Sequence, residues 1–169
     1  MSQPYDIDFT EEAIIKDHIK KFLLYPKFWS DNKNQIAINL KWRSQVFLPN
    51  KLNKIPNKSG IYAFVLRPKY RNLFPTNYLF YVGKTNRTLR ERFKEYISEK
   101  NGVGKPRKKV HKMLNQYENY LLFFYAEIAM EKSVNKSERS LLNTFVPHIN
   151  ASIPKARIKK ELQYVYEQN

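Results

Sequence analysis

Two charged side chains adjoin apolar stripes on predicted helices, where an unpaired charge is costly to bury. Glu138 is in helical register with the apolar residues of ERSLLNTF, and Arg92 borders the apolar face of NRTLRERFKEYISEK. A carboxylate in such a place can be a metal ligand or a charge partner, and a guanidinium can hold a phosphate through two parallel hydrogen bonds. The alternatives are a first-turn glutamate that faces solvent and stabilises the helix dipole, and an ordinary solvated arginine.

Two tyrosines and a lysine lie in neighbouring apolar segments. Tyr62 belongs to GIYAFVLR and Tyr81 to YLFYVGK, in which Lys84 follows Gly83. Antiparallel pairing would bring the two phenols side by side at one end of a sheet, where Gly83 would let the chain turn and Lys84 would add charge to the same pocket. Either tyrosine could equally be a strand aromatic that packs on its neighbour. GKT is not a P-loop, because Tyr78 stands where that motif requires glycine.

The segments around these residues show strand and helix patterns. β-Branched and aromatic residues predict strands at 60–67, 78–84 and 120–128, and helical spacing of apolar residues predicts helices at 86–100, 110–117 and 138–145. Ser133 or Ser137 could cap the last helix, which Pro147 ends. A first helix is expected from Thr10 to just before Pro26, and IAINLKW could be a short strand.

The chain is strongly basic and has no cysteine. Its 169 residues include 31 Lys and Arg against 15 Asp and Glu, and the net charge of +16 favours nucleic acid as a partner over an anionic membrane surface. The lack of cysteine excludes disulfides, thiolate zinc sites and a cysteine nucleophile. The polar, acidic start and the shortness of every apolar stretch predict a soluble, cytoplasmic protein.

Basic residues gather in groups that could neutralise phosphates. The predicted nucleic-acid-binding residues are Arg67, Lys69 and Arg71 in the long hairpin loop, and Lys105, Arg107, Lys108, Lys109 and Lys112 farther along the chain. A third group, Lys155, Arg157, Lys159 and Lys160, lies near the C-terminus. Tyr70 and Phe74 could wedge or stack on bases, although Phe74 could instead be buried. The three histidines are too far apart in sequence to predict a His-based metal site.

The order of these residues resembles the GIY-YIG nuclease family. The matching positions are GIY at 60–62, YVG at 81–83, Lys84, Arg92, Tyr96, Glu138 and Asn150, within about residues 58–152. The PHIN sequence around Asn150 is similar to the usual ending of the family. Val82 replaces the isoleucine of the second tripeptide, and the spacing between the two tyrosines is longer than usual there. Tyr96 stands where excision-repair-type members have tyrosine and homing-type members often have histidine.

The resemblance implies an α/β (α+β) fold with a central three-stranded antiparallel sheet flanked by helices. Residues 58–152 would form the nuclease core, residues 1–57 a mainly helical extension packed on it, and residues 153–169 a basic helical tail. The long connection between the first two strands would be a DNA-contacting insertion.

The resemblance also implies metal-dependent hydrolysis of phosphodiester bonds. Glu138 would hold one Mg²⁺ or Mn²⁺, a hard ion that keeps several waters and needs only one or two carboxylates. Arg92, together with Lys84, would neutralise the charge that develops on the phosphate. Tyr96 and Asn150 would complete the site, Asn150 by supporting it through its amide.

One of the two strand tyrosines would orient and deprotonate the attacking water. We favour Tyr62 as the base and Tyr81 as its hydrogen-bonding partner, and the reverse assignment stays open. An ordinary phenol, with a pKa of about 10, is a poor base near neutrality. Nearby cations would lower that pKa, whereas burial would raise it.

The sequence therefore favours a stand-alone DNA endonuclease, of restriction type or with a mobile-element, phage or repair function. It would act on double-stranded DNA as a monomer or homodimer. A catalytically silent nucleic-acid-binding module on the same fold is the main alternative, and a basic scaffold protein that binds RNA is a weaker one. The enzyme is preferred because every candidate catalytic position is filled.

Overall fold

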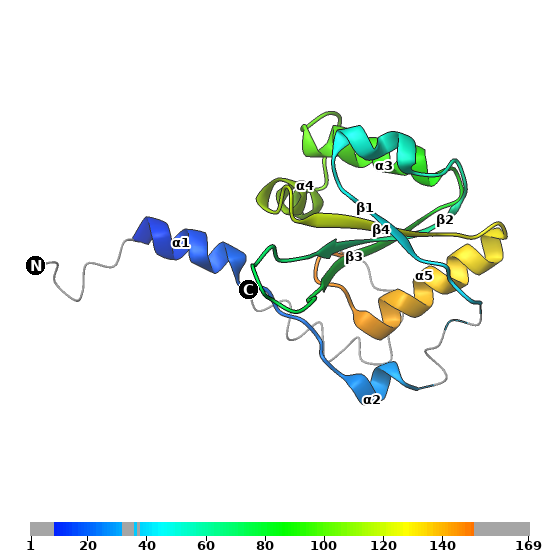
Figure 1. Cartoon of the computed structure of the whole chain (residues 1–169), viewed down its shortest axis with the longest axis horizontal. Coiled ribbons are helices and arrows are strands. Elements are labelled where there is room, and N and C mark those ends of the chain that lie inside the picture. Colours follow the sequence, from blue (N-terminus) through cyan, green and yellow to red (C-terminus); the bar gives the residue numbers. More distant parts are fainter. Residues whose placement is uncertain (1–8, 32–35, 37, 151–169) are drawn as a thin grey trace, which may run out of the picture.

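The computed structural model describes residues 9–31, 36 and 38–150, which form a sheet with helices on both faces (Figure 1). The elements in chain order are α1 (Phe9–His18), α2 (Pro26–Trp29), β1 (Arg43–Val46), the 3-10 helix η2 (Pro49–Lys54), β2 (Gly60–Leu66), β3 (Tyr78–Thr85), α3 (Leu89–Lys100), α4 (Lys108–Gln116), β4 (Leu121–Glu127) and α5 (Glu131–Phe145). Helices α3 and α4 cover one face of the sheet, and α5 covers the other (Figure 1).

The sheet is antiparallel with the strand order β1-β4-β2-β3. The three predicted strands are confirmed as β2, β3 and β4. Strand β1 pairs with β4 and makes the sheet four-stranded rather than three-stranded. It begins directly after the IAINLKW segment, in which a short strand was expected. In this order β3 is an edge strand, so one side of it has no strand partner among the described residues.

The free side of β3 is covered by residues that follow α5. The side-chain amide of Asn150 accepts a hydrogen bond from the Val82 N–H at 3.0 Å and donates one to the Val82 carbonyl at 2.8 Å. The Ile149 N–H donates to the Phe80 carbonyl at 3.0 Å. These bonds take the place of a neighbouring strand and fix the middle of β3.

The sheet buries an apolar layer on each face, because alternate residues of a strand point to opposite sides. Tyr62 and Phe64 of β2 belong to the larger core with Phe93 of α3, whereas Ala63 packs with Leu142 of α5.

A β-bulge interrupts the pairing of β2 with β3. The register shifts between Phe64 and Val65, so that Phe64 pairs with Tyr81 and Val65 with Leu79. The extra residue, Phe80, therefore joins the same core as its neighbour Tyr81. The bulge places two consecutive side chains of β3 on the face covered by α3 and α4.

The helices around the site begin and end largely as local signals predict. Thr88 caps α3 through a capping box with Glu91. Helix α5 ends at Phe145 before Pro147, as expected, but it begins at Glu131 with no side-chain cap. The prediction that Ser133 or Ser137 caps α5 is therefore wrong, because both serines lie inside the helix.

The first helix is shorter than predicted. Helix α1 ends at His18 rather than just before Pro26, and it extends away from the sheet (Figure 1). Ile14, Ile15 and Ile19 are more than half exposed within the part of the chain that the structure describes.

The predicted C-terminal helix and its basic group at 155–160 lie outside the described residues. The division into an extension, a core and a tail stays a prediction. Among the residues that the structure describes, no helix is long and apolar enough to cross a membrane.

Candidate active site

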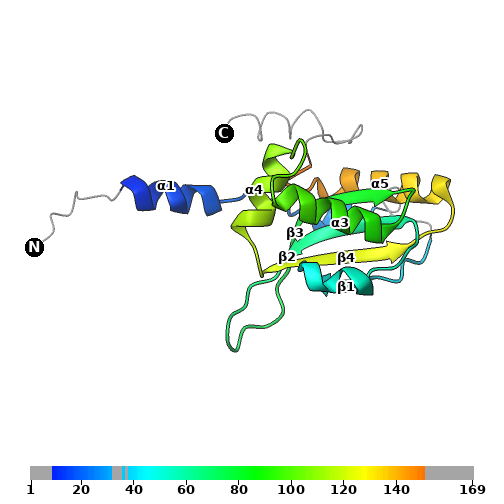
Figure 2. The ribbon, with the colours of Figure 1, turned by 90° about the horizontal axis from the view of Figure 1, so that it is seen from above.

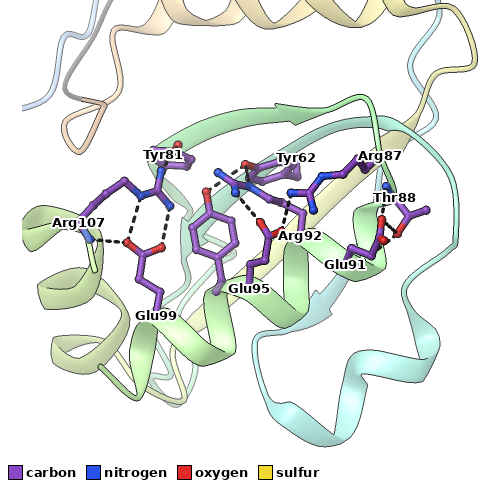
Figure 3. Close-up of polar contacts among 10 residues, drawn as sticks. Tyr62, Tyr81, Arg87, Thr88, Glu91, Arg92, Glu95, Glu99 and Arg107 are labelled. Carbon is purple, nitrogen blue, oxygen red and sulfur yellow. Dashed lines mark hydrogen bonds and ion pairs between the residues drawn. The ribbon is translucent and has the colours of Figure 1, made fainter. Parts of the chain in front are cut away.

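Three phenols and two arginines gather on the face of the sheet covered by α3 and α4 (Figure 3). The Tyr62 hydroxyl lies 3.0 Å from the Tyr96 hydroxyl and accepts a hydrogen bond from Arg92 Nε at 2.9 Å. The Tyr81 hydroxyl accepts a hydrogen bond from Arg107 Nη1 at 3.1 Å. The cluster thus contains two phenol–guanidinium pairs contributed by separate parts of the chain.

The two strand tyrosines are diagonal neighbours rather than a bonded pair. Tyr62 lies opposite Gly83 and Tyr81 lies opposite Phe64, which leaves 6.4 Å between the two tyrosine ring centroids. The expectation that Tyr81 is the hydrogen-bonding partner of Tyr62 is therefore wrong in this structure. Tyr96 takes that place.

Gly83 has a different role from the predicted turn. It lies inside β3, directly beneath the Tyr62 ring, and a Cβ atom at this position would come within 2.5 Å of Tyr62 Cζ. No real side chain tolerates such a contact without displacement. The glycine is needed because the phenol lies against the backbone of the edge strand.

Each arginine is held by its own glutamate on α3 (Figure 3). Arg92 Nη1 donates to Glu95 at 2.6 Å. Arg107 donates to both carboxylate oxygens of Glu99, from Nε at 3.1 Å and from Nη2 at 2.8 Å. Because the two glutamates are one helical turn apart, they fix both guanidiniums beside the phenols.

Burial dominates the electrostatics of the two inner phenols. It raises the pKa of Tyr62 to about 12, with a smaller contribution from Tyr81, and the hydrogen bond from Arg92 offsets this only in part. Burial also raises the pKa of Tyr96 well above its usual value. Tyr96 is 1% exposed, so this phenol lies in the core rather than at the surface. Tyr81 is half-buried and is the phenol that faces outward.

Lys84 and Glu138 meet on the opposite face of β3. Lys84 Nζ lies 3.0 Å from Glu138 Oε2 and donates a hydrogen bond to Asn135 Oδ1 at 2.8 Å. Lys84 does not join the pocket of the two tyrosines as predicted, because alternate residues of a strand point to opposite sides. A single edge strand therefore separates the phenol cluster from the carboxylate.

The donors around Lys84 suit a hard cation. The oxygens of Glu138 and Asn135 converge on one ammonium group, and carboxylate and amide oxygens are the ligands that Mg²⁺ prefers. Across residues 9–31, 36 and 38–150, no group of three or more His, Asp or Glu side chains could hold a metal. These residues fit an ion that keeps most of its waters, and they do not fit a closed structural metal site.

The predicted nucleic-acid-binding residues are exposed. Arg67, Lys69 and Arg71 lie in the connection between β2 and β3, which extends beyond the sheet (Figure 2), and Lys105, Arg107, Lys108, Lys109 and Lys112 lie in or just before α4. The two groups are near the same end of the sheet, because the Arg67 N–H bonds to the Tyr120 carbonyl shortly after α4. Lys112 also forms an ion pair with Asp17 at 2.8 Å.

Three residues of this region, and one contact between two predicted residues, were not expected from the sequence. Glu95 lies three residues after Arg92 on one helix, and Asn135 lies three residues before Glu138, so helical spacing could have indicated both. Glu99 and the contact of Arg107 with Tyr81 have no such signal, since a loop brings these residues together.

Comparison with known proteins gives one match. The family model described as the GIY-YIG catalytic domain matches residues 58–150. No curated protein and no solved structure gives a significant match.

Proposed function

Because the chain belongs to the GIY-YIG family, whose domains are generally endonucleases that use divalent metals, we propose that it is a metal-dependent DNA endonuclease. The observation that carries this proposal is the Tyr62 hydroxyl held by Arg92 Nε at 2.9 Å beside Tyr96. A phenol bonded to a guanidinium combines a proton acceptor with a phosphate ligand, and hydrolysis of a phosphodiester needs both.

In the proposed reaction a water oxygen bonds to phosphorus and the bond from phosphorus to the leaving oxygen breaks. Tyr62 takes the proton of the attacking water once its own proton is lost, and Arg92 stabilises both the phenolate and the phosphate. The leaving oxygen is protonated from solvent. Tyr81 is the second candidate for the base, because its hydroxyl is also bonded to an arginine and is more exposed.

Glu138 would hold the divalent cation, Mg²⁺ or Mn²⁺, with Asn135 beside it. When bound, such a cation supplies stabilisation of the charge on the leaving oxygen. Lys84 neutralises Glu138 in the present structure, and it would be free to contact phosphate once the carboxylate has another partner.

The substrate would be duplex DNA held by the two exposed basic groups. Both groups lie near one end of the sheet and consist of exposed cations, which usually contact phosphates rather than base edges. Cytoplasmic location, a restriction-type role and a monomeric or dimeric state belong to the same proposal.

The test is cleavage of supercoiled plasmid with Mg²⁺ or Mn²⁺ by the wild type and Glu138→Ala. The matched control is Glu127→Ala, which removes an exposed carboxylate of β4 that pairs with Arg43 at 3.6 Å and is separated from β3 by strand β2. We expect the wild type and E127A to nick or linearise the plasmid, with no cleavage in EDTA. We expect E138A to bind DNA with near-normal affinity and to lose cleavage. Tight binding with no cleavage by the wild type on any plasmid or metal would favour the silent binding module.

A further inference from the structure

Arg107 reaches the candidate active site from outside the elements that carry the tyrosines. It stands at the N-terminal cap of α4, after the loop that follows α3. Its backbone N–H and its guanidinium both bond to Glu99, and its Nη1 donates to the Tyr81 hydroxyl at 3.1 Å. This number of contacts is unusual for an arginine in an exposed basic run, where most side chains are simply solvated.

The guanidinium of Arg107 keeps donors for a ligand. An arginine has five N–H donors. Those that bond to Glu99 and Tyr81 account for three of them, and the side chain is 44% exposed. The guanidinium also interacts with the Tyr96 hydroxyl, so at least one N–H group remains that can reach a phosphate oxygen without breaking the bonds that position it.

Arg107 and Arg92 border one open pocket. The pocket has a volume of about 480 Å³, and its lining also includes Glu95, Glu99 and Lys105. The guanidinium carbons of the two arginines lie 5.1 and 5.2 Å from the centroid of the same Tyr96 ring. Two like charges around one ring would repel each other, and the paired glutamates offset that repulsion.

We propose that Arg107 forms a second phosphate-binding position, which holds the phosphate next to the one bound by Arg92 and fixes the Tyr81 hydroxyl at the same time. Two guanidiniums beside one ring suit a ligand with negative charges repeated at short intervals, as in a nucleic-acid strand. The inference rests on the proposed nuclease function for its substrate, but phosphate binding by Arg107 does not depend on catalysis.

The competing interpretation is that Arg107 and Glu99 form a structural ion pair, which only holds the loop 101–107 against α3. Binding to a labelled DNA duplex in EDTA, measured over a range of salt concentrations, separates the two interpretations. Direct contact predicts that Arg107→Gln lowers the slope of log K against log salt by about one. Arg43→Gln removes the same charge from an arginine that is 67% exposed on β1, and it should leave the slope unchanged.

A second variant controls for the charge left on Glu99. Arg107→Gln leaves that carboxylate without its main partner, and an unpaired carboxylate would repel DNA even if Arg107 never touched a phosphate. The double variant E99Q/R107Q removes both charges. If the contact is direct, the double variant keeps the reduced slope and weakened binding. Recovery of wild-type binding in the double variant would overturn the proposal.

The rate of cleavage under single-turnover conditions tests whether Arg107 contributes to the candidate active site. We expect R107Q to slow cleavage by roughly 10²-fold or more and Arg107→Lys to restore only part of the rate, because lysine keeps the charge but loses the planar fork. R43Q should remain within about twofold of the wild type. Thermal unfolding of each variant is measured alongside, and a rate loss that tracks a loss of folded protein, with an unchanged salt slope, would refute the proposal.

Failure of the proposed function is distinguishable from failure of this inference. If the wild type binds DNA but never cleaves it, and R107Q still lowers the salt slope, the nuclease proposal fails and the phosphate-binding position stands. If the wild type cleaves and R107Q behaves like R43Q in slope and rate, the phosphate-binding position fails and the nuclease proposal stands.

Discussion

At the scale of single residues, the two strand tyrosines have similar partners and different surroundings. Each hydroxyl accepts a hydrogen bond from an arginine, but Tyr62 is 1% exposed whereas Tyr81 is half-buried. Burial raises the free energy of the ionised Tyr62 phenolate, and the charge and hydrogen bond of Arg92 lower it only in part. Tyr62 would therefore be a strong base once ionised, but its raised pKa keeps the ionised fraction small at neutral pH.

The raised pKa of Tyr62 predicts a steep pH dependence of cleavage. With a pKa of about 12, the ionised fraction of Tyr62 is roughly one in 10⁵ at pH 7 and grows about tenfold per pH unit. The single-turnover rate should therefore rise by up to tenfold per unit between pH 6 and 9. Tyr62→Phe should abolish this rise, while Tyr81→Phe should retain it at a lower rate. A wild-type profile that is flat over this range would contradict the role of Tyr62 as base.

The close approach of Gly83 to Tyr62 predicts a cost for any side chain at position 83. Gly83→Ala should lower the free energy of unfolding by about 1–3 kcal/mol, as other overpacked cores do, and should slow cleavage because the Tyr62 hydroxyl shifts. Chemical denaturation measures the change. Combining Gly83→Ala with Tyr62→Leu should cost less than the sum of the single changes, because the smaller side chain relieves the contact. Strict additivity would rule out the proposed clash.

At the scale of elements, the edge strand β3 organises the site. Its alternating residues carry Tyr81 toward α3 and Lys84 toward α5, and the amide of Asn150 closes its free side at Val82. The bulge opposite Phe64 sets which side chains of β3 face α3. The phenol cluster and the Lys84–Glu138 ion pair therefore lie on the two sides of this strand.

The long connection between β2 and β3 is an exposed aromatic hairpin. Tyr70 is 76% exposed and Phe74 is 74% exposed, so the alternative of a buried Phe74 is wrong. The Lys69 ammonium lies 5.3 Å from the centroid of the Tyr120 ring, and residues 59–90 include no Asp or Glu. Exposed rings in an acid-free segment suit stacking on nucleic-acid bases.

Replacing both hairpin aromatics should weaken DNA binding without affecting the fold. We expect Y70A/F74A to lower DNA affinity by roughly tenfold or more, since base–aromatic stacking contributes about 1–3 kcal/mol per base. Leu24→Ala is the matched control, because this side chain is 78% exposed and lies outside the hairpin. Fluorescence anisotropy measures affinity, and circular dichroism checks the fold. Equal affinity of Y70A/F74A and L24A would show that the hairpin rings do not contact DNA.

At the scale of the whole molecule, two layers of helices enclose a sheet whose basic groups lie near one end. Eight of the 31 Lys and Arg residues of this chain, whose net charge is +16, are exposed in the hairpin and in the α4 region. Such a surface attracts a polyanion over distances limited by the Debye length, which is about 8 Å at physiological salt.

Binding to nucleic acid should therefore be strongly salt-dependent. If most of the exposed basic residues contact phosphates, affinity should fall by about 10³–10⁵-fold between 50 and 200 mM salt. Titrations with duplex DNA and with duplex RNA of the same sequence measure this fall. Preference for RNA at every salt concentration would favour the RNA-binding scaffold over the DNA endonuclease. A shallow dependence would contradict a binding surface made of these residues.

Most of the secondary structure of this protein can be predicted from local patterns in its sequence. Strands β2, β3 and β4 follow from their content of β-branched and aromatic residues, and helices α3, α4 and α5 follow from the helical spacing of apolar residues, because both signals are local in the chain. The excess of basic residues and the order of the family's residues from Tyr62 to Asn150 are also properties of the chain alone.

The contacts among these residues could be established only from the tertiary structure. Tyr96 replaces Tyr81 as the partner of Tyr62, and Lys84 faces away from both strand tyrosines. Arg107 enters the site beside Tyr81 from a loop 26 residues farther along the chain. Strand register, a single β-bulge and the path of a loop set these contacts, and each depends on packing between distant segments rather than on local periodicity.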